Sequence, residues 1–204
     1  MTAYADATTA ETASRHTRVT RLVHMGLAIT IIIQLATSLV MSGPGETRPG
    51  DALFQLHRLS GFGAAFFALM FWLVILLRQR GTAIGALFPW LSGPRLRALR
   101  EDVVVHVRSA MRFRLPEYEP GSPLASAVHG LGLMLMSAMA GSGLIYAIQV
   151  WAGQSAEPDG MWVMQIHFAL ANLVWVYLIG HAGLGLIHHY MRTMRLSEMW
   201  SFRG

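Results

Sequence analysis

The stretch Ile166–Tyr190, with the sequence IHFALANLVWVYLIGHAGLGLIHHY, decides the fold of this chain of 204 residues. A run of this length with no Asp, Glu, Lys or Arg is typical of a membrane-spanning helix. His167 and His181 lie fourteen positions apart in it, a spacing that falls about 40° short of four helical turns. Both imidazoles are therefore expected on one face of the helix, separated by about 21 Å along its axis.

Three further apolar stretches of the chain have the length of a bilayer-spanning helix, and none of the four contains proline or an acidic residue. We therefore expect one all-α, integral membrane four-helix bundle over residues 15–204, preceded by a disordered cytoplasmic tail over residues 1–14. The expected spans lie at about residues 22–41, 54–77, 124–151 and 161–191.

Composition supports a membrane protein and limits the chemistry available to it. Hydrophobic residues make up 53% of the chain and charged residues only 13%, against about 25% charged in soluble domains; the mean hydropathy is +0.43. The chain has no cysteine, which excludes disulfides, iron–sulfur clusters, thiolate zinc sites, covalently attached haem and cysteine catalysis. The nine histidines remain as the strong nitrogen ligands.

The basic charge of +5 indicates orientation and not nucleic-acid binding. Of the sixteen arginines, fourteen lie in the N-terminal segment, the loop 78–123 and the C-terminal tail. The positive-inside rule then places both termini and this loop in the cytoplasm of a multi-pass protein of the bacterial inner membrane. Residues 94–114 are expected to form an amphipathic helix, either on anionic membrane lipid or as a docking surface for a partner subunit. His16 and His106 are expected in solvent-facing segments.

The remaining histidines are expected at matching depths in the membrane. His57, at the outer end of the second span, matches His167, whereas His24, near the inner end of the first span, matches His181. By depth alone His188 is also a possible partner for His24. Ionisable side chains in a membrane span are costly and usually functional, so two His–His pairs, one near each surface, are the main prediction for the site.

Two imidazoles that face each other across a bundle suit the two axial positions of a haem iron. A zinc or di-iron site fits less well, because the spans carry no carboxylate. Small residues beside the ligands leave room for the porphyrin ring; Gly61 follows His57 by four positions, and Gly185 follows His181 by four. Methionine–histidine ligation is also open, with candidates Met25, Met161 and Met164.

Four stretches of the chain, one in each span, carry a family resemblance. They are RLVHMGLAI, LFQLHRLSGFGAAF, SPLASAVHGLGLMLMSAMAGSGLIYA and the stretch quoted first. Over nearly all of residues 15–200 the chain resembles the bacterial cytochrome b561 family and the related di-haem cytochrome b subunits of nickel–iron hydrogenases and formate dehydrogenases. The resemblance implies two non-covalent b-type haems in a stacked arrangement. The matching ligands are His57 and His167 on the periplasmic side, and His24 and His181 on the cytoplasmic side.

Further residues are candidates for contacts with the haems or with a quinone. Arg58 and Arg21 lie near the outer and inner histidines and are expected to pair with haem propionates or to anchor the helices at the interface. In the family a quinone site lies near a haem. The inner-face candidates for it are His129, His188, His189 and Arg192.

The sequence therefore predicts a di-haem b-type cytochrome that transfers electrons across the membrane between the quinone pool and a redox partner. One alternative is a membrane anchor subunit of a larger respiratory oxidoreductase, a hydrogenase or a dehydrogenase. Another is a stand-alone quinone or superoxide oxidoreductase. A haem-free membrane bundle is the alternative from a different class. Whether the chain is itself an enzyme stays open.

Overall fold

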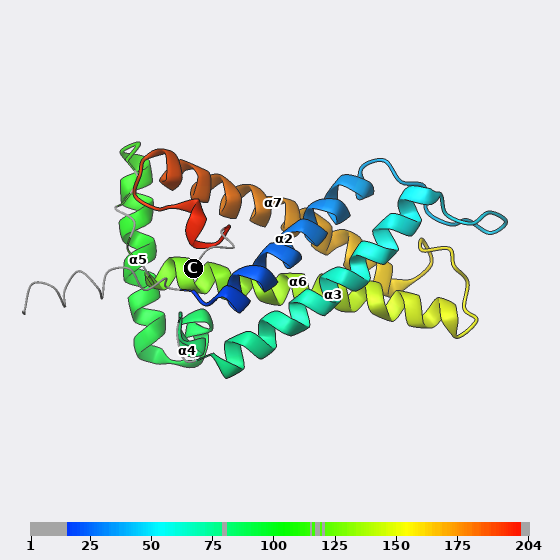
Figure 1. The fold of residues 1–204 in the computed structure, drawn as a ribbon, viewed down its shortest axis with the longest axis horizontal. Helices are drawn as coiled ribbons and strands as arrows, with labels where there is room; N and C mark the ends of the chain where they lie inside the picture. The colour runs from blue at the N-terminus through cyan, green and yellow to red at the C-terminus, as the bar shows by residue number, and fades with distance from the viewer. Residues whose placement is uncertain (1–15, 79–80, 115, 117–118, 120, 201–204) are drawn as a thin grey trace, which may run out of the picture.

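The computed structural model describes residues 16–78, 81–114, 116, 119 and 121–200, and these residues contain helices and turns but no strand (Figure 1). Four of the helices in this described part are long and apolar enough to cross a membrane. Their bounds are α2 Arg18–Ser38, α3 Ala52–Leu77, α6 Pro123–Trp151 and α7 Trp162–Tyr190. The all-α, four-span architecture expected from the sequence is confirmed.

The observed helices follow the expected spans, and the largest difference is in the first. That helix was expected over residues 22–41, but α2 begins at Arg18 and ends at Ser38. Its start is set by Thr17, whose side-chain oxygen accepts a hydrogen bond from the Thr20 N–H at 3.2 Å, because a hydroxyl at this position satisfies an otherwise unpaired helical donor. Hydropathy detects the apolar run but not this cap. The expected tail over residues 1–14 lies outside the described residues.

The second span is capped by a carboxylate at the end of the bundle away from the arginine-rich loop; we call this end the outer end and the opposite one the inner end, after the predicted orientation. Asp51 accepts hydrogen bonds from the backbone N–H groups of Phe54, at 2.7 Å, and Ser42, at 2.9 Å. These donors lower the pKa of the exposed Asp51 carboxyl below its usual value. Asp51 thereby fixes the first turn of α3 and holds the preceding connection against it.

The long helices pack in sequence, α2 along α3, α3 against α6, and α6 against α7. Within the described residues, no comparably close packing joins α7 to α2 or α3. At mid-length the four helices share one apolar cluster, in which a buried side chain of α7, Val174, contacts the other helices. The buried members of this central cluster are Ile31, Leu35, Ala64, Met136 and Val174.

The segment between α3 and α6 contains short helices and one longer helix. The short ones are α4, Ile84–Leu87, and the 3-10 helix η1, Pro89–Leu91; α5, Gly93–Met111, matches the amphipathic helix expected over residues 94–114. In Figure 1, α5 lies across the end of the bundle at which α2 begins and α7 ends. A second 3-10 helix, η2, Leu196–Glu198, follows α7.

A carboxylate on α5 holds this helix against the start of α6. Asp102 Oδ2 accepts a hydrogen bond from the Leu124 N–H at 2.9 Å, and Asp102 Oδ1 lies 2.9 Å from His106 Nδ1. The His106 side chain is 36% exposed, so it lies at the surface as expected, and His16 is partly exposed.

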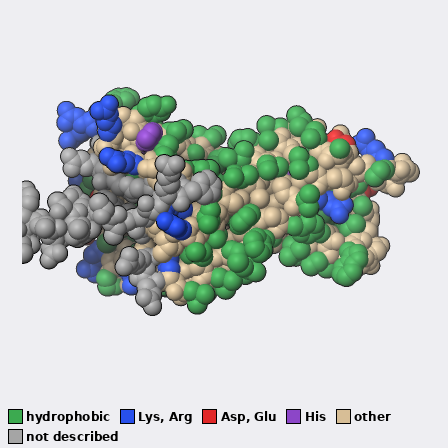
Figure 2. Space-filling view, viewed as in Figure 1, with side chains coloured by type: hydrophobic (Ala, Val, Ile, Leu, Met, Phe, Trp, Pro, Cys, Tyr) green, Lys and Arg blue, Asp and Glu red, His purple; other side chains and the backbone are tan. Residues whose placement is uncertain are grey.

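The surface of the molecule fits a membrane along its length. In the face shown in Figure 2, hydrophobic side chains cover the middle, and arginines gather at the end that carries α5, with fewer charged groups at the opposite end. The chain is therefore a multi-pass membrane protein. Its arginines lie mostly at the α5 end, and by the positive-inside rule this distribution predicts that α5 is cytoplasmic.

A glycine in α6 allows the close approach of the segment between α3 and α6. A Cβ on Gly130 would overlap the backbone carbonyl of Leu87, whereas a Cβ on Gly141 in the same helix would meet nothing within 4 Å. We expect Gly130→Ala to destabilise the fold by about 1–3 kcal/mol, and Gly141→Ala to be neutral or stabilising by up to about 1 kcal/mol. Thermal unfolding in detergent measures both; equal midpoints for the two variants would contradict the packing described.

Candidate functional site

The outer histidine pair joins α3 to α7. His57 is one turn inside the start of α3 and His167 one turn inside the start of α7. Their ring centroids are 6.4 Å apart and the ring planes are at 74°. The structure thus brings together the two imidazoles that sequence position alone paired by depth.

Each ring of this outer pair makes a hydrogen bond to a hydroxyl of a neighbouring helix. His57 Nδ1 lies 2.9 Å from Thr37 Oγ1 on α2, and His167 Nδ1 lies 2.8 Å from Ser142 Oγ on α6. Thr37 and Ser142 are both buried. Gln34 on α2 also donates to the backbone carbonyl of His57, so the first turns of α3 are tied to α2 by side chains.

The inner histidine pair joins α2 to α7. The ring centroids of His24 and His181 are 6.3 Å apart, with the planes at 58°. The His24 ring also lies 6.3 Å from Trp200 in the C-terminal segment. His181 stacks on Tyr177, with centroids 5.3 Å apart and planes within 8°. In the described ranges, the buried Nδ1 of His24 has no hydrogen-bond partner.

Both pairs fit a metal held between two imidazoles. An imidazole nitrogen binds a transition metal at about 2 Å, and adding the distance from each nitrogen to its ring centre gives a centroid separation of about 6 Å. The observed separations of 6.3 and 6.4 Å match this value. The angles of 58° and 74° are also compatible, because axial rings rotate freely about the metal–nitrogen bond. The donor set is two neutral nitrogens in apolar surroundings, which suits a haem iron.

Other metal sites fit this arrangement less well. No group of three or more His, Cys, Asp or Glu side chains that could hold a metal ion lies within the described ranges. A tetrahedral zinc site or a carboxylate-bridged di-iron site needs such a cluster. The described residues therefore offer two nitrogen donors at each of two levels along α7, and not a compact metal centre.

The glycines and arginines expected around the haems occupy different environments. A Cβ on Gly61 would lie 3.5 Å from the Gln34 side chain, and one on Gly185 would lie 3.9 Å from Met194. Arg58 is exposed at the outer end and donates to Gln55 Oε1 at 3.1 Å. Arg21 is buried one turn before His24. Contacts of these four residues with a haem remain predictions.

Of the four inner-face quinone candidates, one lies beside the inner pair. His129 on α6 is exposed, and its ring centroid is 5.2 Å from that of His181, edge to face. His188 instead bonds Thr193 through Nδ1 at 3.0 Å. His189 Nδ1 lies 3.5 Å from the Leu196 N–H, and Arg192 is exposed with a φ of 60° in the turn after α7. His188 and His189 are thus in the last turn of α7, and Arg192 is in the turn that follows it.

Three kinds of contact were not predicted from the sequence. They are the hydrogen bonds of Thr37 and Ser142 to the outer histidines, the contact of Trp200 with His24, and the hydrogen bond of Gln34 to the backbone of His57. Each joins residues that are far apart in the chain or on different helices. The only sequence signal was the presence of polar residues, Thr37, Ser142 and Gln34, inside apolar spans. Such residues commonly bond the carbonyl of their own helix, so this signal does not identify a histidine partner.

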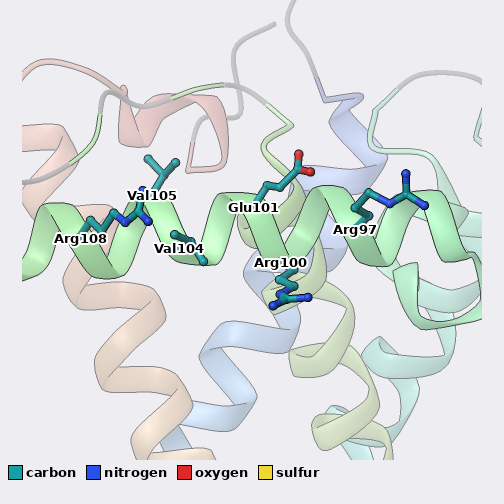
Figure 3. Close-up of a pocket in the computed structure, with 6 residues that line it drawn as sticks. All are labelled: Arg97, Arg100, Glu101, Val104, Val105 and Arg108. Carbon is teal, nitrogen blue, oxygen red and sulfur yellow. The ribbon is translucent and has the colours of Figure 1, made fainter.

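A shallow groove runs along α5, away from the histidine pairs. Its lining comes from this single helix, and in Figure 3 Arg97 and Glu101 project to one side of the helix and Arg100 to the other. A groove lined by one helix encloses no ligand. The lining shows that the exposed surface of α5 combines arginines with valines, as expected of a helix on anionic lipid. The lining residues are Arg97, Arg100, Glu101, Val104, Val105 and Arg108.

Comparison with known proteins gives one family match. The family model described as prokaryotic cytochrome b561 matches residues 15–202. No curated protein and no solved structure matches the chain. The match covers all four long helices and all four paired histidines.

Proposed function

Because this chain belongs to the prokaryotic cytochrome b561 family, whose members are membrane b-type cytochromes of electron transport, we propose that it binds two haem b groups and transfers electrons across the membrane. The outer haem is held by His57 and His167, and the inner haem by His24 and His181. Quinone or quinol is the electron-transfer partner in the lipid, and a redox protein is the partner at the surface.

The two facing imidazole pairs are the observation that carries this proposal. They lie at two levels of one helix, α7, with the central cluster of apolar side chains between them. Two separate binding levels are what a transmembrane electron path needs, because a single level would leave most of the membrane uncrossed. Outside the central cluster α7 packs less closely on α2 and α3 than on α6, which also supports insertion of a flat ring between these helices.

In this mechanism the protein would supply the ligands of the iron and would exclude water from its surroundings. Haem, when bound, supplies a reversible one-electron iron couple. His57 with His167, and His24 with His181, would each hold one haem iron by two imidazole nitrogens, and an iron held in this way would supply electron transfer in preference to oxygen binding. Phe71 and Tyr177 beside the inner pair, together with the central cluster, exclude water from the path. Arg58 and Arg21 are proposed to pair with propionates at the two ends.

We propose that quinone chemistry takes place at the inner end, near His129. This ring is exposed on α6 and in edge-to-face contact with His181. Electron exchange with a quinone also moves protons, and imidazole exchanges protons near neutral pH. His188 and His189, in the last turn of α7, are further candidates for proton exchange with solvent, and Arg192, just after that helix, is a further candidate for the quinone site.

The proposed location is the bacterial inner membrane, with α5 and both termini in the cytoplasm. The gathering of arginines at the α5 end supports this orientation. The exposed surface of α5, which carries arginines and valines, contacts anionic lipid in this proposal. An anchor role in a larger respiratory oxidoreductase uses the same electron path and differs only in the protein partner.

The test is the haem content of the purified protein. We expect two haems for each chain by the pyridine haemochrome assay, a b-type absorption spectrum, and reduction of both haems by a quinol in detergent. A colourless protein from cells supplied with haem precursors would contradict the haem proposal. Two haems that a quinol leaves oxidised, while a chemical reductant reduces them, would contradict only the quinone assignment.

A further inference from the structure

The outer histidines differ from the inner ones in how their second ring nitrogen is held. Thr37 Oγ1 lies 2.9 Å from His57 Nδ1, and Ser142 Oγ lies 2.8 Å from His167 Nδ1. The two contacts have the same form. In each, a buried hydroxyl on one helix of a closely packed pair, α2 with α3 or α6 with α7, bonds the imidazole on the other helix.

The direction of these hydrogen bonds follows from the other contacts of the hydroxyls. Thr37 Oγ1 lies 2.7 Å from the carbonyl oxygen of Ile33, and Ser142 Oγ lies 2.9 Å from that of Met139. A carbonyl only accepts, so the single hydroxyl proton is donated to the backbone. The hydroxyl oxygen must then accept from Nδ1–H of its histidine. Each neutral ring is thereby fixed in the tautomer that carries its free lone pair on Nε2.

We propose that Thr37 and Ser142 are positioning residues for the outer haem, each fixing the tautomer and orientation of one axial histidine. This inference rests on the proposed ligation by His57 and His167. It assigns a role to two residues that the family match does not distinguish from other polar residues of the spans.

In the inner pair, His24 has no hydroxyl beside its second ring nitrogen that would correspond to Thr37 or Ser142, within the described part of the chain. His24 Nδ1 is buried there without a hydrogen-bond partner. His181 is instead held by face-to-face stacking on Tyr177. Loss of Thr37 or Ser142 is therefore expected to change one haem site and leave the other as it was.

The effect expected from the hydroxyls is on affinity and on redox potential. A partner that accepts from the second ring nitrogen orients the ligand and raises its basicity, and removing such a partner typically weakens metal binding by about 10–100-fold. A more basic axial ligand favours the oxidised iron. The midpoint potential of the outer haem should therefore rise when the hydroxyl is removed, and the potential of the inner haem should stay unchanged.

The experiment uses the haem-loaded protein in detergent. We expect Thr37→Val and Ser142→Ala each to speed the transfer of one haem to an excess haem-scavenging protein by about tenfold or more. Each should also raise one of the two midpoint potentials in a redox titration. Thr37→Ser keeps the hydroxyl and should restore both values, which a general packing defect at this position would not allow.

Matched controls lie in the same two helices. Thr30 bonds the carbonyl of Leu27 at 2.8 Å. Ser137 bonds the carbonyl of Leu133 at 2.7 Å and accepts a hydrogen bond from Trp72 Nε1 at 2.9 Å, but neither side chain bonds a histidine in the described structure. Thr30→Val and Ser137→Ala should keep the wild-type rates and potentials. The inference is overturned if Thr37→Val and Ser142→Ala match these controls while the wild-type chain retains two haems. A wild-type chain with fewer than two haems overturns the proposed function first.

Discussion

Replacing His57 or His167 with alanine is expected to reduce the haem content from two for each chain to one. Each variant removes one of two axial nitrogens from the outer site and leaves the inner pair, about 21 Å away along α7, unchanged. The remaining haem should keep its absorption spectrum and its midpoint potential. The pyridine haemochrome assay, normalised to protein, measures the loss, and transmembrane electron transfer in vesicles should fall to background.

His106→Ala is the matched control for this prediction, because that histidine lies on α5 and bonds Asp102, outside both pairs. It should retain two haems. If His57→Ala and His167→Ala also retain two, the outer assignment is wrong, and a methionine near the outer end becomes the next ligand to test. Met161 and Met164 pack in the apolar cluster around Phe54 at that end.

The second large effect is expected at the inner site, where His181→Ala should remove one haem and His188→Ala should remove none. Depth in the membrane allowed either histidine to face His24. The ring of His181 is the one 6.3 Å from His24, whereas His188 bonds Thr193 in the turn after α7. His24→Ala should give the same single-haem protein as His181→Ala.

The haem content and the midpoint potential of each variant distinguish whether His181 or His188 is the ligand at the inner site. Loss of a haem in His188→Ala, with both haems kept in His181→Ala, would assign the ligand to His188 instead. If all three single variants keep two haems, ligation of the inner haem by histidine is refuted. An inner haem that is retained but shifted in potential in His188→Ala would indicate only a nearby charge or proton effect.

The sequence was sufficient to predict the spans and the pairing of the histidines, for a physical reason. Both depend on quantities that are local to one helix, namely hydropathy over some twenty residues and the 3.6-residue period. His167 and His181 share a face because they share α7, and the loop arginines predict which end is cytoplasmic. The haem ligation itself remains a prediction, supported by the centroid separations.

What the sequence did not predict depends on contacts between helices. The hydroxyl of Thr37 bonds His57 on a different helix, and Trp200 reaches His24 from the far end of the chain. The glycines show the same limit. In α6, a Cβ on Gly130 would overlap the Leu87 carbonyl, and one on Gly132 would overlap Tyr177. Close packing accounts for these two positions.

The placement of one histidine pair near each end of α7 has an electrical consequence. In the proposed assignment, an electron that passes between the pairs moves about 21 Å through a hydrocarbon layer of about 30 Å. It therefore crosses about two thirds of the membrane voltage, which corresponds to about 1.6 kcal/mol for each 100 mV. With the cell interior negative, inward transfer works against the voltage and outward transfer is driven by it. The rate between the two levels should then respond to an applied diffusion potential in sealed vesicles.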